Sequence, residues 1–364
     1  MTTCLSTNGG NVHGRDADPN RLVVATVDGI AVLAREGGEG PWTIASRALE
    51  AIPVSALIRD PRSGRIFAGA HSGGLYFSAG DGSAFRRLAG PLENRHVYSL
   101  RCIETDDIHM LLAGTEPVGL WRSDDGGQNW RELPAIAAAP NHARWSFPEP
   151  PHFAHTKSIA ADPRDPDVLY VGVEQGGLLK TADGGASWRE LDGFFSPDDP
   201  VYKDIHQVVL RPSNPDEIFM TSGTGLYHSE DRGEHWEHLT DSSFMMAYPD
   251  QLILSPLDEG VLFMSGAAKT PRYWRGEKSA AGTVLASHDS GRSWQRAGEG
   301  LPVGNRSNIE AMSIAATANG FALFAGDTDG AVWYSGDNGE NWSRIASGLA
   351  PISKPAHYAH IEGR

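Results

Sequence analysis

The chain has 364 residues, and its 46 acidic residues outnumber 31 basic ones, which gives a formal net charge of −15 and an isoelectric point near 5.3. Because this charge opposes nucleic acid and anionic lipid, we expect neither nucleic acid nor a membrane as a partner. The sequence has no membrane-spanning or signal-peptide pattern and only two cysteines, Cys4 and Cys102, so we expect a cytoplasmic protein.

In chain order the sequence is a succession of short apolar runs bounded by Gly, Asp and Pro, without a helical period. The clearest unit covers 155–192: HTKSIAADP, VLYVGVEQG, GLLKTADGG and SWREL read as four strands separated by turns. Units of the same kind cover 21–50, 53–90, 96–134, 155–192, 203–241, 248–299 and 308–348. The pattern predicts an all-β chain with a repeated four-stranded unit.

Five units share the octapeptide Ser/Thr-x-Asp-x-Gly-x-x-Trp. Its copies are SDDGGQNW from Ser123, TADGGASW from Thr181, SEDRGEHW from Ser229, SHDSGRSW from Ser287 and SGDNGENW from Ser335. Degenerate copies start at Ala34 and Ser78, and the seven starts lie 44 to 58 residues apart, as in propeller blades. The Asp can bind turn amides and the Gly can adopt positive φ, so we expect structural roles for five aspartates. These are Asp125, Asp183, Asp231, Asp289 and Asp337.

With these copies the chain resembles the Asp-box (BNR-repeat) β-propeller superfamily, which includes sialidases, xyloglucanases and sortilin-type receptors. The resemblance implies one seven-bladed β-propeller over residues 1–361. We expect residues 353–361 to form a strand that pairs into blade one and closes the ring. Residues 362–364 end an Ile-Glu-Gly-Arg sequence that reads as a protease recognition site, and we expect them to lie outside the fold.

In such propellers the octapeptide turns lie on one face, and the long insertions here fall on the opposite face. These insertions cover 134–154, 192–202 and 267–282. Loops that grow on one face of a rigid scaffold usually carry function. Their aromatic and basic residues make Trp145, Arg272 and Trp274 candidate ligand-binding residues.

The first strand of each blade lines the central channel, and aligning these strands places polar residues at one level near the loop-rich face. They are Ser55, Tyr98, Lys157, His206, Asp250 and Glu310. Among them Lys157, His206, Asp250 and Glu310 are the candidate catalytic residues, because acids, a lysine and a histidine can support acid–base chemistry. Candidate ligand-binding residues at or near this level are His96, Tyr98, His155, Asp204, Tyr248 and His357. A divalent metal is a candidate cofactor, with His155, His206 and His357 as candidate ligands.

The sequence favours a hydrolase or lyase that acts on a small molecule in the central channel. A divalent metal is one way in which this reaction could be assisted. A non-catalytic propeller that binds a carbohydrate or peptide is the first alternative, and an assembly-factor scaffold is another. A sialidase-like glycoside hydrolase is a weaker alternative, because the Arg-Ile-Pro motif and the arginine triad of sialidases are not found. The expected partner is a small-molecule or glycan ligand, and the sequence leaves the oligomeric state open.

Overall fold

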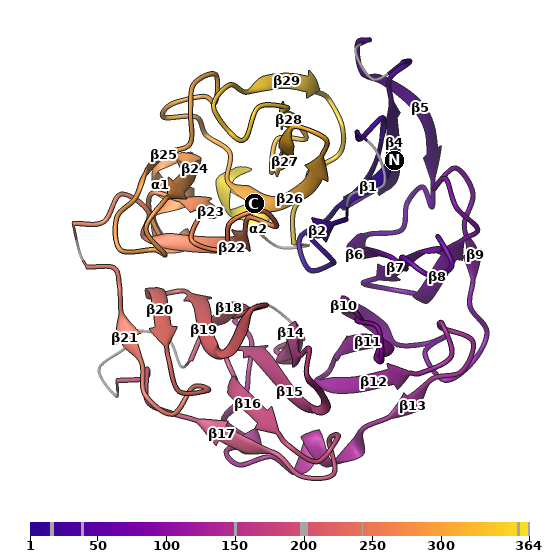
Figure 1. Cartoon of the computed structure of the whole chain (residues 1–364), viewed down its shortest axis with the longest axis vertical. Coiled ribbons are helices and arrows are strands. Elements are labelled where there is room, and N and C mark those ends of the chain that lie inside the picture. The colour runs from indigo at the N-terminus through magenta and orange to yellow at the C-terminus, as the bar shows by residue number, and fades with distance from the viewer. Residues whose placement is uncertain are drawn as a thin grey trace.

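The structure is a computed structural model that describes residues 1–14, 18–37, 40–148, 151–196, 203–241, 243–354 and 357–362. Seven sheets stand around a central axis in chain order (Figure 1), which confirms the predicted all-β, seven-bladed propeller. No helix among the described residues is long and apolar enough to cross a membrane.

Each of the first six sheets has four strands, and the seventh has five. Blades one to three contain β1 (Thr2–Leu5), β3 (Arg21–Thr26), β4 (Gly29–Ala34) and β5 (Thr43–Ala48); β6 (Val54–Arg59), β7 (Ile66–Ala70), β8 (Gly74–Ser78) and β9 (Arg86–Arg87); β10 (His96–Glu104), β11 (His109–Glu116), β12 (Gly119–Ser123) and β13 (Arg131–Glu132). Blades four and five contain β14 (His155–Asp162), β15 (Asp165–Glu174), β16 (Gly177–Thr181) and β17 (Arg189–Leu191); β18 (Ile205–Arg211), β19 (Asn214–Ser222), β20 (Gly225–Ser229) and β21 (Glu237–His238). Blades six and seven contain β22 (Tyr248–Leu254), β23 (Leu262–Ala267), β24 (Gly282–Ser287) and β25 (Gln295–Arg296); β2 (Val12–His13), β26 (Ile309–Thr317), β27 (Gly320–Asp327), β28 (Val332–Ser335) and β29 (Ser343–Ala346).

Helical turns occur on the loop-rich face: η1 (Pro134–Ala138), η2 (His142–Arg144), α1 (Pro271–Glu277) and α2 (His357–Glu362). The apolar core lies between neighbouring blades. One buried cluster, for example, joins Leu112 of blade three to Leu169 and Trp188 of blade four. The channel-facing strands are therefore fixed by packing on both of their sides.

The octapeptide turns share one set of hydrogen bonds. In blade four, Thr181 Oγ1 donates to Asp183 Oδ1 at 2.7 Å and accepts the amide of Gly185 at 3.0 Å, while the amide of Ser187 donates to Asp183 Oδ1 at 2.9 Å. The same three contacts recur at Asp125, Asp231, Asp289 and Asp337. Each carboxylate thus holds together the turn that leads into the outermost strand of its blade.

We predict that these turns make the fold sensitive to strong acid. Hydrogen bonds from Ser187 and Thr181 lower the pKa of Asp183 from 3.8 to about 2. A carboxyl whose pKa is depressed in the folded state stabilises the fold fully above pH 3.8 and loses that contribution as the pH falls through about 2. The melting temperature of Asp183→Ala should therefore lie below that of the parent at pH 5, and the difference should shrink toward pH 2. A difference in melting temperature that stays constant from pH 5 to pH 2 would contradict the role of Asp183 in the turn.

The ring closes through residues near the start of the chain, and this differs from the expectation. β1 pairs in parallel with β3 in blade one, with Cys4 opposite Val23, and β2 pairs in parallel with β26 in blade seven. The prediction of a closing strand at 353–361 is wrong, because residues 357–362 form the helix α2 (Figure 1). Since β1 already covers the inner edge of β3, that edge is not free for a second strand.

The segment between β1 and β2 crosses the channel. The amide of Asn8 donates to the carbonyl of Ser55 at 3.0 Å, and the carbonyl of Asn8 accepts the amide of Leu100 at 3.1 Å. On the other side, Gln251 Nε2 donates to the carbonyl of Thr7 at 2.5 Å. Residues from blades two, three and six therefore bind this segment, so the channel is filled below the level of the predicted site.

Candidate functional site at the channel mouth

The inner strands of blades two to seven each contain a β-bulge at the same level. In each pairing one residue is skipped, and the skipped residues are Ser55, Tyr98, Lys157, His206, Asp250 and Glu310. These are the six positions that the sequence alignment placed at one level. A bulge leaves its residue outside the ladder and redirects the side chain. The four candidate catalytic residues therefore share a backbone feature as well as a level, and all four are buried.

Glu174, the last residue of β15, is the hub of a buried polar network. Its Oε1 lies 2.5 Å from Lys157 Nζ and 3.7 Å from Lys354 Nζ, and its Oε2 lies 2.5 Å from His155 Nε2. Burial alone would raise the pKa of Glu174, but the two ammonium groups hold it well below its usual range. Sequence reasoning missed Glu174, although it precedes the turn of the clearest unit and pairs with His155.

Asp250 and Glu310 bind the segment that precedes and begins α2. Lys354 Nζ donates to Asp250 Oδ1 at 2.7 Å, while Glu310 accepts the amide of Lys354 at 3.0 Å, Ser353 Oγ at 3.1 Å and His357 Nδ1 at 3.0 Å. Burial would raise the pKa of Asp250, yet Lys354 lowers it to about 2. Both carboxylates are thus engaged with this chain's own segment, and their catalytic roles stay predictions.

Asp204 and His206 form a second buried pair beside Glu174. His206 Nδ1 lies 2.6 Å from the carbonyl of Pro249, so this nitrogen carries the proton. His206 Nε2 lies 3.3 Å from Asp204 Oδ2 without hydrogen-bond geometry, and Asp204 Oδ1 has no hydrogen-bond partner. Burial opposes ionisation of Asp204, but His206 keeps its pKa low. One ligand atom from each of Glu174, Asp204 and His206 falls within 4.8 Å of the other two.

Where blades two and three meet, His71, His96 and Glu116 form a corner of the network that is more exposed to solvent than the residues around Glu174. Here Glu116, the last residue of β11, faces three histidines: His71 Nε2 at 3.7 Å, His96 Nδ1 at 3.5 Å and His155 Nδ1 at 3.1 Å. The side chains of His71 and His96 are 22% and 44% exposed, whereas that of Glu116 is 6% exposed. Tyr98 stacks on His155 with ring centroids 3.8 Å apart.

The ionisation of this corner follows from its contacts. Burial would lower the pKa of His155, but its contacts with Glu116 and Glu174 raise it above its ordinary value. Burial would raise the pKa of Glu116, but His155 and His71 lower it. These contacts favour the protonated form of the His155 imidazole and the ionised form of the Glu116 carboxylate. His71 and Glu116 were not among the residues predicted from the sequence.

The predicted aromatic and basic loop residues fall in different places. Trp274 of α1 is fully buried. Its ring centroid lies 5.7 Å from that of Tyr248 and 5.6 Å from that of His357, so Trp274 packs against two of the predicted ligand-binding residues. Trp145 packs on His142 at 4.8 Å beside the core between blades three and four. Arg272 is exposed and lies over the ring of Tyr273. Of these three, Trp274 packs on predicted channel residues, Tyr248 and His357.

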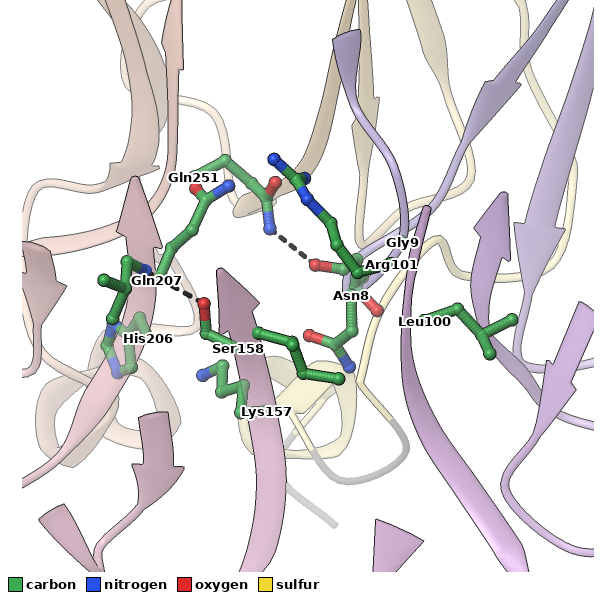
Figure 2. Close-up of a pocket in the computed structure, with 12 residues that line it drawn as sticks. Asn8, Gly9, Leu100, Arg101, Lys157, Ser158, His206, Gln207 and Gln251 are labelled. Atoms are coloured by element: carbon green, nitrogen blue, oxygen red, sulfur yellow. Dashed lines mark hydrogen bonds between the residues drawn. The ribbon is translucent and has the colours of Figure 1, made fainter. Parts of the chain in front are cut away.

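Below the network the crossing N-terminal segment leaves a small polar cavity of about 20 Å³, enough for about one water molecule. Figure 2 shows Lys157, Ser158 and His206 on one side of this cavity and Asn8 on the other. Among the described residues, the N-terminal segment therefore leaves room for little more than a water molecule on this side of the network.

Comparisons with known proteins support the propeller fold. No family model matches the chain. Over 245 residues it is 22% identical to an oligoxyloglucan-reducing end-specific xyloglucanase of Emericella nidulans, covering 62% of this chain and 29% of that protein. An ancestral GH74 enzyme superposes with a TM-score of 0.58 at 19% identity, covering 81% of this chain and 38% of that one. The WD40 propeller domain of Doa1 also gives 0.58, at 11% identity over 90% and 93% of the two chains.

The chain thus spans about a third of the length of the xyloglucanase-type proteins that it resembles. At these identities the superpositions establish the propeller fold. The activities and substrates of these neighbours are properties of those proteins.

Proposed function

We propose that the chain is a hydrolase or lyase for a small polar molecule, and that the molecule binds at the corner formed by His71, His96 and Glu116. The observation that carries this proposal is the contact of one buried carboxylate, Glu116, with three histidines where the network meets solvent. Groups with perturbed pKa values in a recess are typical of active sites. Burying this many charges for stability alone would be unfavourable, because desolvation opposes it.

We infer a role for each group from its contacts. Glu116 is ionised and can take a proton from water or from a substrate hydroxyl. His155 is held by both ring nitrogens between Glu116 and Glu174, so it orients Glu116 and takes part in proton transfer only through that carboxylate. His71 and His96 lie at the entrance and would contact the substrate. Deeper in the network, Lys157 and Lys354 hold Glu174 ionised and thereby keep His155 in place.

Hydrolysis of a panel of p-nitrophenyl esters, phosphates and glycosides tests this function. We expect turnover of at least one class, and we expect Glu116→Gln and His155→Gln to lower kcat by about 100-fold or more, the usual contribution of acid–base groups. His142→Ala, an exposed histidine on the same face, is the matched control and should keep full activity. No turnover in the panel, or turnover that both variants retain, would contradict the proposal.

A second candidate function is carbohydrate binding without turnover. It is favoured by the xyloglucanase and GH74 neighbours and by exposed aromatic rings on the loop-rich face, Phe153 at 49% and Tyr273 at 50%. Binding of xyloglucan oligosaccharides with no hydrolysis, weakened by Tyr273→Ala, would favour this candidate over the enzyme.

A further inference from the structure

We propose that His71, His96 and Glu116 bind a divalent metal ion of the zinc type. The three come from different strands at the loop-rich face: His71 follows β7, His96 begins β10 and Glu116 ends β11. Two imidazoles and one carboxylate are a donor set that zinc and its neighbours prefer. The inference goes beyond the proposed function, because an ion can bind here whether or not the chain is an enzyme.

The spacing of the donor atoms fits an ion better than it fits hydrogen bonds. Glu116 Oε1 lies 3.7 Å from His71 Nε2 and 3.5 Å from His96 Nδ1, and the three residues each offer a ligand atom within 4.8 Å of the other two. Hydrogen bonds between such atoms are about 2.7–3.2 Å long. Ligands held at about 2.0–2.2 Å from a tetrahedral ion are separated by about 3.4 Å. Small side-chain adjustments would therefore place all three atoms on one ion.

Two of these three atoms have no hydrogen-bond partner among the described residues. Glu116 Oε1 and His96 Nδ1 are both shielded from solvent and form no hydrogen bond. Glu116 as a whole is 6% exposed, so this oxygen is an unpartnered acceptor on a buried carboxylate. Buried polar atoms without a partner are rare in folded proteins, and each one calls for a ligand or another explanation. An ion coordinated by Glu116 Oε1 and His96 Nδ1 would give each of these two atoms a partner.

The surroundings supply the outer contacts that metal ligands need. His155 Nδ1 lies 3.1 Å from the other oxygen of Glu116, and His155 is itself tied to Glu174. Such outer-shell partners orient ligating carboxylates. The partly exposed rings of His71 and His96 allow entry from the loop-rich face.

Three protein ligands leave a fourth position for water or for an oxygen of a bound molecule. The ligand class that this site selects is a molecule with a carboxylate, phosphate or polarised carbonyl group. In the proposed hydrolase, a bound ion would lower the pKa of its water, and Glu116 would then act through the ion.

Metal titration of the whole chain tests the site. After treatment with EDTA, the protein is titrated with Zn²⁺ by calorimetry and with Co²⁺ by visible absorption. We expect one equivalent to bind. His96→Ala should weaken binding at least 10-fold and alter the Co²⁺ spectrum, whereas His142→Ala should change neither. Because His96 is 44% exposed, its variant should remain folded, which circular dichroism verifies.

Equal affinity in the parent and in both His96→Ala and Glu116→Gln would overturn the site, as would no binding at about 1 mM metal, where any specific site should be occupied. Metal binding without turnover of any substrate would support this site and contradict the proposed enzyme. The two proposals therefore fail separately.

Discussion

Lys157→Met should lower the free energy of unfolding by about 3–5 kcal/mol, the range found when one partner of a buried ion pair is removed. Lys157 and Glu174 are 2% and 1% exposed at their side chains, and their charged atoms are 2.5 Å apart. The variant keeps most of the apolar stem but removes the positive charge nearest to the buried carboxylate of Glu174. Urea unfolding followed by tryptophan fluorescence measures the change.

The control for this prediction is Lys269→Met, which breaks a surface pair with Glu277. Both side chains of that pair are about half exposed, so its loss should cost less than about 1 kcal/mol. A double variant, Lys157→Met with Glu174→Gln, should be more stable than the sum of the single changes predicts. If Lys157→Met unfolds at the same urea concentration as Lys269→Met, the buried pair does not contribute as described.

Leu5→Ala should destabilise the ring by about 2–5 kcal/mol, the usual cost of truncating a buried leucine. Leu5 lies in β1, is fully buried, and packs in a cluster with Leu22 of blade one and Phe324 of blade seven. The truncation therefore opens a cavity where the ends of the ring meet. The midpoint of urea unfolding provides the measurement.

Val12→Ala is the matched control, because Val12 lies in β2 of the same segment but is 49% exposed. It should change the unfolding free energy by less than about 0.5 kcal/mol. Equal effects of the two substitutions would show that the first strand does not close the ring as the structure has it.

Repetition in the sequence explains how much could be predicted. The five octapeptides define the blade period, so the number of blades and the level of Lys157, His206, Asp250 and Glu310 follow from alignment. The structure places these four residues at equivalent positions, because each one is the unpaired residue at the β-bulge of its inner strand.

The features that the sequence did not predict lie outside the repeated octapeptide and inner-strand patterns. Lys354 and α2 follow the last blade, where no period remains to guide a prediction. β1 pairs in parallel with its neighbour, so no hairpin turn in the sequence marks it as a strand. Glu116 and Glu174 end second strands, and they reach the site only because the ladder sets them opposite His96 and His155.

The central claim is that the Glu116 corner is a site for chemistry, and the activity of Glu116→Gln relative to its stability tests it most directly. We predict that this variant loses about 100-fold or more in kcat on the best substrate of the panel. Its free energy of unfolding should fall by no more than about 1–3 kcal/mol, because only Glu116 Oε2 contacts His155 and Glu116 Oε1 forms no hydrogen bond, so the variant should stay folded in the assay. Activity that falls only in proportion to the folded fraction would contradict the claim.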